Sequence, residues 1–210
     1  MNEDYFFNVK KKRPEEIYNK VSDYFYGKRL EDYASSKNIQ RIQIKITKRA
    51  FEILELEKKH ALVLDAGCGP GFASFYIKKL GYDVVAMDLI SNFLFYYNLQ
   101  DLNPLVGDMC IPPFRPNTFD AIISISALQW IYRDITNKKM TQAFSNLIKS
   151  FYEILKFGSK VIFQFYPKNE IIITHMKKII NENTMFNGGY LIDNPDNPKK
   201  RKIFLILEKE

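Results

Sequence analysis

The sequence has 210 residues, of which 46% are hydrophobic and 26% are charged, and this composition predicts one soluble globular domain. Its apolar runs are far shorter than the roughly 18 residues that span a bilayer, and its N-terminus lacks the apolar core of a secretory signal. We therefore expect no membrane segment and a cytoplasmic location, nuclear or nucleolar only in a eukaryote. The net charge of +7 is divided into +4 over residues 1–60, −3 over 61–136 and +6 over 137–210, and such basic flanks suit either a phosphate-bearing substrate or solubility alone.

The first 60 residues are predicted to form helices. Pro14 and the two glutamates after it indicate a helix over 14–27. A second helix over 37–56 has an apolar stripe at helical spacing, made of Ile39, Ile42, Ile46, Ala50 and Ile53. Its opposite face is cationic and consists of Lys37, Arg41, Lys45 and Lys48. That face either follows a phosphate backbone or is simply solvated.

From residue 61 onward, apolar runs alternate with helical patterns. Strands are expected at 61–66, 83–88, 104–108, 119–125, 160–166, 190–193 and 203–208, with a Gly188-Gly189 turn opening the last unit. Helices are expected at 71–80, 91–100, 138–155 and 170–182. The pattern predicts an α/β fold, namely a single Rossmann-like domain whose mostly parallel seven-stranded sheet is covered by helices on both faces and closes with an antiparallel strand. Residues 1–60 would be a helical extension packed on the domain formed by residues 61–210.

A glycine turn follows the first expected strand. Residues 61–71 read Ala-Leu-Val-Leu-Asp-Ala-Gly-Cys-Gly-Pro-Gly, in which Gly67, Gly69 and Gly71 allow positive φ angles and a close approach to a ligand. Dinucleotide enzymes usually show G-x-G-x-x-G without an acid like Asp65, because a carboxylate would repel a pyrophosphate. A cofactor with a cationic amino-acid end would be attracted instead. The run resembles the first motif of class I S-adenosylmethionine-dependent methyltransferases, and the alternative is an ordinary buried strand with a glycine turn.

Acidic residues lie at or near the ends of the first three strands, where open α/β sheets bind ligands. Asp88 lies 21 residues past Gly67 and could accept both ribose hydroxyls of an adenosine, while Asp108 could accept the adenine amine. Asp65 would lie nearest the methionine end. Acids also cap helices and end strands, which is the structural alternative. The residues expected to contact the cofactor are Asp65, Gly67, Cys68, Gly69, Gly71, Asp88, Leu89, Asp108, Met109 and Ser126.

The two cysteines and two histidines indicate no further chemistry. Cys68 and Cys110 suggest a reducing compartment rather than a disulfide framework. Together with His60 and His175 they form no metal-ligand pattern, so we expect no metal site and both histidines at the surface.

The acceptor is expected beyond the strands at 119–125 and 160–166. Trp130 and Tyr166 follow these strands and could stack on a base or, alternatively, pack a helix onto the sheet. Enzymes that methylate exocyclic amines often carry Asn-Pro-Pro-aromatic after the fourth strand. Ser-Ala-Leu-Gln-Trp stands there instead, at residues 126–130, which indicates a different acceptor atom.

Several strings together resemble the small-subunit (18S-type) ribosomal RNA guanine-N7 methyltransferase family. They are Arg13-Pro14-Glu15-Glu16 with Tyr18, residues 39–45 leading into Arg49-Ala50, residues 65–71, residues 123–130, residues 164–169, and Gly188-Gly189 with Asp193-Asn194-Pro195. The resemblance covers nearly the whole chain. Eukaryotic members continue into a long basic tail, whereas this sequence ends at Glu210, which weakens the expectation of nucleolar targeting.

The resemblance implies S-adenosylmethionine-dependent methylation of guanine N7 in small-subunit ribosomal RNA, with a role in ribosome biogenesis. Guanine N7 has a free lone pair, so alignment replaces a general base. Trp130 and Tyr166 would hold the base, and Gln129 or Lys168 would bind its edge or phosphate. The resemblance also implies a small zinc-binding activator subunit that pairs with the edge strand near 104–109. Two alternatives stay open: a small-molecule (quinone or metabolite) methyltransferase, and a non-catalytic ribosome-assembly scaffold.

Overall fold

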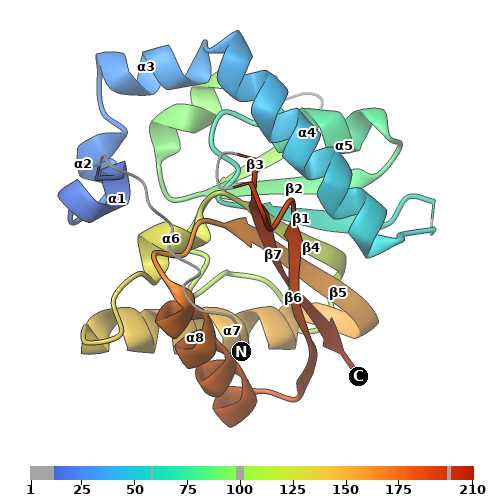
Figure 1. Ribbon diagram of the computed structural model, residues 1–210. Coiled ribbons are helices and arrows are strands. Elements are labelled where there is room, and N and C mark those ends of the chain that lie inside the picture. Colours follow the sequence, from blue (N-terminus) through green and yellow to red (C-terminus); the bar gives the residue numbers. More distant parts are fainter. Residues whose placement is uncertain (1–11, 58, 98–101, 198–199) are drawn as a thin grey trace.

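The computed structural model describes residues 12–57, 59–97, 102–197 and 200–210, which form a seven-stranded sheet between layers of helices (Figure 1). The strands are β1 (Leu62–Ala66), β2 (Asp83–Asp88), β3 (Asn103–Val106), β4 (Phe119–Ile125), β5 (Leu155–Phe165), β6 (Phe186–Asp193) and β7 (Lys202–Lys209). The helices are α1 (Pro14–Ile17), α2 (Val21–Tyr24), α3 (Lys28–Ala34), α4 (Lys37–Leu54), α5 (Phe72–Lys79), the 3₁₀ helix η1 (Ser91–Tyr96), α6 (Leu128–Ile131), α7 (Lys138–Ile154) and α8 (Glu170–Asn183).

The strand order is β3-β2-β1-β4-β5-β7-β6. Neighbours from β3 to β5 are parallel, and β7 is antiparallel to both β5 and β6. Strand order therefore reverses direction between β1 and β4, and in such sheets ligands bind beyond the carboxyl ends of these strands. The predicted fold class is confirmed, including the antiparallel closing strand.

Two apolar cores hold the helices on the sheet. On one face α7 buries a stripe at helical spacing, made of Phe144, Leu147, Ile148, Phe151 and Ile154, and α8 packs beside it. On the other face α4 and α5 bury Ile46, Ala50, Leu54, Ala73 and Ile77. Burying a large aliphatic or aromatic side chain stabilises the fold by about 1.5–3 kcal/mol, so these stripes fix both layers. No helix within the described ranges is long and apolar enough to cross a membrane.

The strands lie close to the positions expected from the sequence, except at the starts of β5 and β6. β5 begins at Leu155, directly after α7, where a helix and a loop were expected up to residue 160. β6 begins at Phe186, so Gly188 lies inside a strand rather than in a turn. A Cβ added at Gly188 would come 2.0 Å from the carbonyl oxygen of Ile206 on β7, so only glycine permits this close pairing.

The N-terminal predictions are partly wrong. Residues 14–27 do not form one helix: α1 and α2 have four residues each, and α3 was not foreseen. The chain is extended at Tyr18 and takes a φ of +53° at Gly27, and both conformations interrupt a helix. The helix expected over 91–100 is the shorter η1, and residues 98–101 lie outside the described part of the chain. The one-turn helix α6 was also missed.

Two expectations about burial also need correction. Ile42, which the sequence places in the apolar stripe of α4, is exposed. Thr47 is buried instead, and its hydroxyl group donates a hydrogen bond to the carbonyl oxygen of Gln43. His60 is exposed as expected, but His175 is half-buried. Its Nδ1 shares a hydrogen bond with the hydroxyl group of Tyr132, so this histidine packs α8 against the segment after α6.

Candidate functional site

The glycine turn joins β1 to α5 and has the backbone that its sequence predicts. Gly67, Gly69 and Gly71 take φ angles of 77°, 54° and 87°, which side chains with a Cβ rarely adopt. The N–H groups of Gly67 and Cys68 both donate to the carbonyl oxygen of Met87, at 2.8 and 3.1 Å, and tie the turn to β2. A Cβ added at Gly69 would meet nothing within 4 Å, so the turn faces open space at that residue.

That space is a cavity of about 110 Å³ between the glycine turn, the ends of β2 and β4, and the N-terminal helices, called the cofactor cavity after the residues expected to contact a cofactor. Seven of the ten residues expected to contact the cofactor line it: Gly67, Gly69, Asp88, Leu89, Asp108, Met109 and Ser126. They come from four separate stretches of sequence that meet because parallel strands end at the same edge of the sheet.

Asp88 is the buried acid of this cavity. Its two carboxylate oxygens accept hydrogen bonds from the N–H groups of Gly69 and Ile90, each at 2.8 Å. Burial raises the pKa of the Asp88 carboxyl, and these hydrogen bonds oppose the shift. Each oxygen keeps a further lone pair, so the carboxylate can still accept hydroxyl groups from a ligand. Asp108 is half-buried, and its side chain accepts from the N–H of Cys110 at 2.8 Å.

The other three expected cofactor residues do not line this cavity. Asp65 is fully buried, accepts a hydrogen bond from the hydroxyl group of Ser74, and lines a separate small cavity with Cys68. Burial raises the pKa of the Asp65 carboxyl to about 7. It also raises the pKa of the Cys68 thiol, which keeps the thiol protonated. Gly71 is the N-cap of α5, and a Cβ added there would come 2.5 Å from the Tyr97 ring.

The N-terminal helices cover the cofactor cavity, which the sequence did not reveal. The ring centroid of Phe25 lies 5.0 Å from those of Tyr33 and Phe93 and 6.0 Å from that of Trp130. Tyr33 also borders the separate small cavity, and burial raises the pKa of its hydroxyl group to about 12. The dense aromatic run before residue 34 was the available signal. Its place in space depends on the chain folding back over the sheet.

The four residues expected at the acceptor are divided between two cavities by α6. Trp130 lines the cofactor cavity, whereas Gln129, Tyr166 and Lys168 line a larger one of about 590 Å³ between α1, α6 and the start of α8. The division follows from one turn of helix, because adjacent residues of an α-helix point about 100° apart around its axis. The structure thus brings together three of the four residues and separates Trp130 from them.

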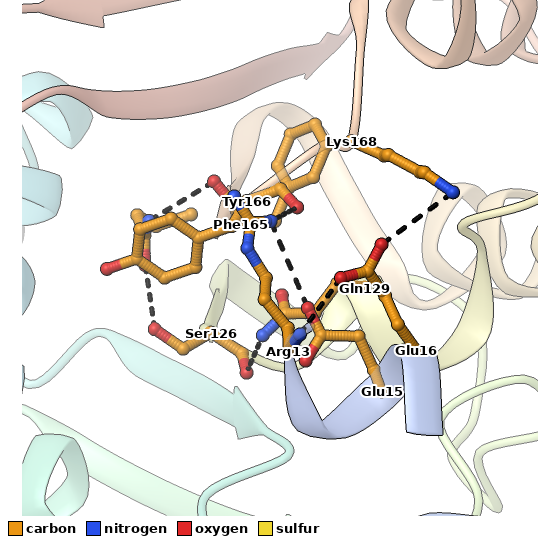
Figure 2. Close-up of polar contacts among 9 residues, drawn as sticks. Arg13, Glu15, Glu16, Ser126, Gln129, Phe165, Tyr166 and Lys168 are labelled. Atoms are coloured by element: carbon orange, nitrogen blue, oxygen red, sulfur yellow. Dashed lines mark hydrogen bonds and ion pairs between the residues drawn. The ribbon is translucent and has the colours of Figure 1, made fainter. Parts of the chain in front are cut away.

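The wall between the two cavities is hydrogen-bonded (Figure 2). Ser126 takes a φ of 59°, and its hydroxyl group donates to Oε1 of Gln164 at 2.8 Å. Nε2 of Gln129 donates to the carbonyl oxygen of Ser126 at 2.8 Å, which fixes the orientation of the amide. Its Oε1 is buried without a hydrogen-bond partner in the described part of the molecule, and a buried acceptor of this kind costs stability.

Polar contacts hold α1 over the larger cavity (Figure 2). Nη1 of Arg13 donates to the carbonyl oxygen of Tyr166 at 2.6 Å, and the guanidinium lies 5.7 Å from the centre of that ring. Nζ of Lys168 lies 3.7 Å from Glu16, an exposed pair that contributes little. Glu15 is buried, and burial raises the pKa of its carboxyl.

Comparison with known proteins identifies the family. The family described as methyltransferase domain matches residues 64–163. The 18S rRNA (guanine-N(7))-methyltransferase bud23 of Schizosaccharomyces pombe is 31% identical over 206 residues, which cover 93% of this chain and 71% of that one. The chain belongs to the 18S rRNA (guanine-N(7))-methyltransferase family. The member from Bos taurus is 34% identical over 197 residues, covering 88% of this chain and 67% of its own.

A solved structure supports the same fold. The complex between the Haloferax volcanii Trm112 methyltransferase activator and a methyltransferase matches with a TM-score of 0.62 and 15% identity, covering 88% of this chain and 100% of that one. At this level of identity the match shows a shared fold alone, and that fold agrees with the methyltransferase domain matched by residues 64–163.

Proposed function

We propose that this chain transfers a methyl group from S-adenosylmethionine to N7 of a guanine in small-subunit ribosomal RNA, as an enzyme of ribosome biogenesis. The observation that carries the proposal is the glycine turn with Asp88 opposite it, in a chain that belongs to the guanine-N7 methyltransferase family. The turn presents an open left-handed glycine where a side chain would occupy the cleft, and the acid at the end of β2 retains free lone pairs.

The residues of the cleft fit S-adenosylmethionine. Asp88 would accept hydrogen bonds from the ribose hydroxyls, and Asp108 would accept one from the adenine amine. Met109 and Leu89 would pack on the adenine ring. The amino-acid end would lie along Gly67 and Gly69, within the field of the buried Asp65. When bound, this cofactor supplies an electrophilic methyl group on a positively charged sulfur.

The chain's own contribution to the reaction is alignment. N7 of guanine carries a lone pair and loses no proton, so the protein must hold it in line with the methyl group rather than remove a proton. Trp130 on the cofactor side and Tyr166 on the other side of α6 are the aromatic surfaces that would hold the RNA. Gln129 offers its unpartnered Oε1 to a base N–H, and Lys168 offers its exposed ammonium to a phosphate.

We also propose that a small zinc-binding activator subunit pairs with β3. This strand is one edge of the sheet, and its unpaired backbone groups can extend the sheet into a partner. Large apolar side chains lie exposed on and around this strand. Val106 is 53% exposed, Ile111 is 70% exposed, and Phe95 of the neighbouring η1 is 84% exposed. The match to a methyltransferase seen in complex with its activator supports this assignment.

A direct assay tests the proposed reaction. The purified chain, with the activator, is incubated with isotope-labelled S-adenosylmethionine and small ribosomal subunits, and label is mapped by chemical cleavage at 7-methylguanosine. We expect a single labelled position, which disappears with Asp88→Ala. Label on another base atom, or none with a chain that binds the cofactor, would refute the assignment.

One observation favours the small-molecule alternative. The helices α1 to α3 enclose the cofactor cavity through Val21, Phe25 and Tyr33, and such a cover suits an enzyme that excludes water from a small acceptor. The same assay run on a metabolite extract separates the two functions. Methyl transfer to a small molecule but not to RNA would establish the alternative.

A further inference from the structure

The outer face of α4 carries cations that have no acidic partner. These cations form a stripe of four side chains, all exposed and opposite the buried face of the helix: Lys37, Arg41, Lys45 and Lys48. Within the described part of the chain none of them forms an ion pair. Glu52 is the only acid of α4, and it pairs with Arg49 at 3.2 Å. The sequence left open whether this stripe binds an anion or is only solvated.

An ion pair fixes the stripe against the end of the sheet. Nε of Arg49 lies 2.9 Å from the carboxylate of Asp193 on β6, and Asp193 is the register partner of Lys202 on β7. Lys45 lies one turn before Arg49. It is close enough to Lys202 for its charge, added to burial, to lower the pKa of the Lys202 ammonium. The two cations therefore lie near each other, beside the ion pair of Arg49 with Asp193.

The cationic surface continues into the larger cavity. Nζ of Lys202 lies 5.7 Å from the centre of the Tyr166 ring, and the guanidinium of Arg13 lies at the same distance from that ring. Tyr166 lines the cavity beneath α1. The stripe on α4, Lys202 and the aromatic wall thus form one path from the surface to the proposed acceptor site, and like charges kept together along it are stabilised by a bound polyanion.

We propose that the stripe formed by Lys37, Arg41, Lys45 and Lys48, continued by Lys202, is a track for the phosphates of a single RNA strand that leads to the cavity beside Tyr166. This inference rests on the proposed RNA function and adds to it the surface that holds the strand outside the site. Successive cations are three or four residues apart and so stand about 4.5–6 Å apart along the helix, and one extended backbone can contact them in turn. A single strand fits because its bases remain free to reach the aromatic ring at the end of the track.

The test compares two pairs of substitutions with the same charge change. Arg41→Gln/Lys45→Gln removes two cations of the track, and Lys177→Gln/Lys178→Gln removes two exposed cations of α8, on the other side of the sheet. The affinity of each protein, with the activator, is measured for a short single-stranded RNA over a range of KCl concentrations. A phosphate contact contributes about 0.7 to the slope of log K against log salt for single strands.

We expect Arg41→Gln/Lys45→Gln to weaken binding about tenfold at low salt and to lower the salt slope by about 1.4, with the α8 pair unchanged. In methylation assays the same pair should raise KM for ribosomal subunits and leave kcat and the affinity for S-adenosylmethionine unaltered. Equal effects of both pairs, binding of a duplex as tight as that of the single strand, or no RNA binding by the wild type would overturn the track. Absence of rRNA methylation by a wild type that binds RNA along these cations would instead refute the proposed function and leave the track standing.

Discussion

Asp65 couples the cofactor pocket to pH. Burial raises the pKa of its carboxyl to about 7, so near neutral pH about half of the molecules carry the negative charge. A cationic ligand next to the glycine turn binds the ionised form better and releases the proton. We therefore predict that the affinity for S-adenosylmethionine rises between about pH 6 and about pH 8, and that Asp65→Asn binds more weakly with no pH dependence in this range. Calorimetry at several pH values measures both.

The same residue affects stability with the opposite sign. The pKa is raised above the unfolded value of 3.8, so the folded state binds the proton more tightly and gains stability that is fully present below about pH 4 and is lost as the pH rises through about 7. Asp65→Asn should therefore flatten the dependence of Tm on pH over this interval. An unchanged profile in thermal denaturation would mean that Asp65 is ionised throughout.

Alanine substitutions at Gly69 and Gly81 distinguish the effect of backbone strain from the effect of a blocked ligand contact. Both glycines take positive φ, 54° and 91°, and an added Cβ meets nothing within 4 Å at either residue, but only Gly69 faces the cofactor cavity. Alanine in this conformation costs about 1–2 kcal/mol, so both substitutions should lower Tm by a few degrees. We predict that Gly69→Ala also weakens S-adenosylmethionine binding at least about tenfold, because its Cβ enters the cleft, while Gly81→Ala binds normally. Equal affinities would place the cofactor elsewhere.

At the scale of elements, β1, β2 and β4 could be predicted because each is a buried apolar run that any parallel sheet would bury. The positions of Asp88 and the glycine turn could also be predicted, because they follow the ends of these strands. Helices α1 to α3 were not predictable, because their aromatic side chains are held by Trp130 and Phe93, far away in sequence. The separation of Gln129 from Trp130 depends on a single turn of helix, which leaves no periodic signal.

The cover formed by α1 to α3 predicts a dynamic response to the cofactor. Val21, Phe25 and Tyr33 line the cavity, yet α1 and α2 have only four residues each, so few internal hydrogen bonds hold them. Bound S-adenosylmethionine adds contacts to these side chains. Hydrogen exchange measured by mass spectrometry should slow over residues 21–34 when the cofactor is added and stay unchanged in α7, whose core stripe is already buried. Unaltered exchange in the cover would mean that it does not contact the cofactor.

At the scale of the whole molecule, the exposed apolar edge at β3 predicts that stability depends on the activator. A partner present at about 100 times its Kd adds about 2.7 kcal/mol, which corresponds to roughly 5–10 °C in Tm for a chain of this size. Val106→Glu puts a charge at the carboxyl end of this edge strand and should abolish the shift. Met185→Glu is the matched control, because Met185 is also exposed but lies next to β6, at the opposite edge of the sheet. Thermal denaturation of each variant with and without the activator decides between the two edges of the sheet. A shift in Tm that survives Val106→Glu and is lost in Met185→Glu would assign the partner to β6. Pairing there would extend the sheet away from the cofactor cavity instead of beside it.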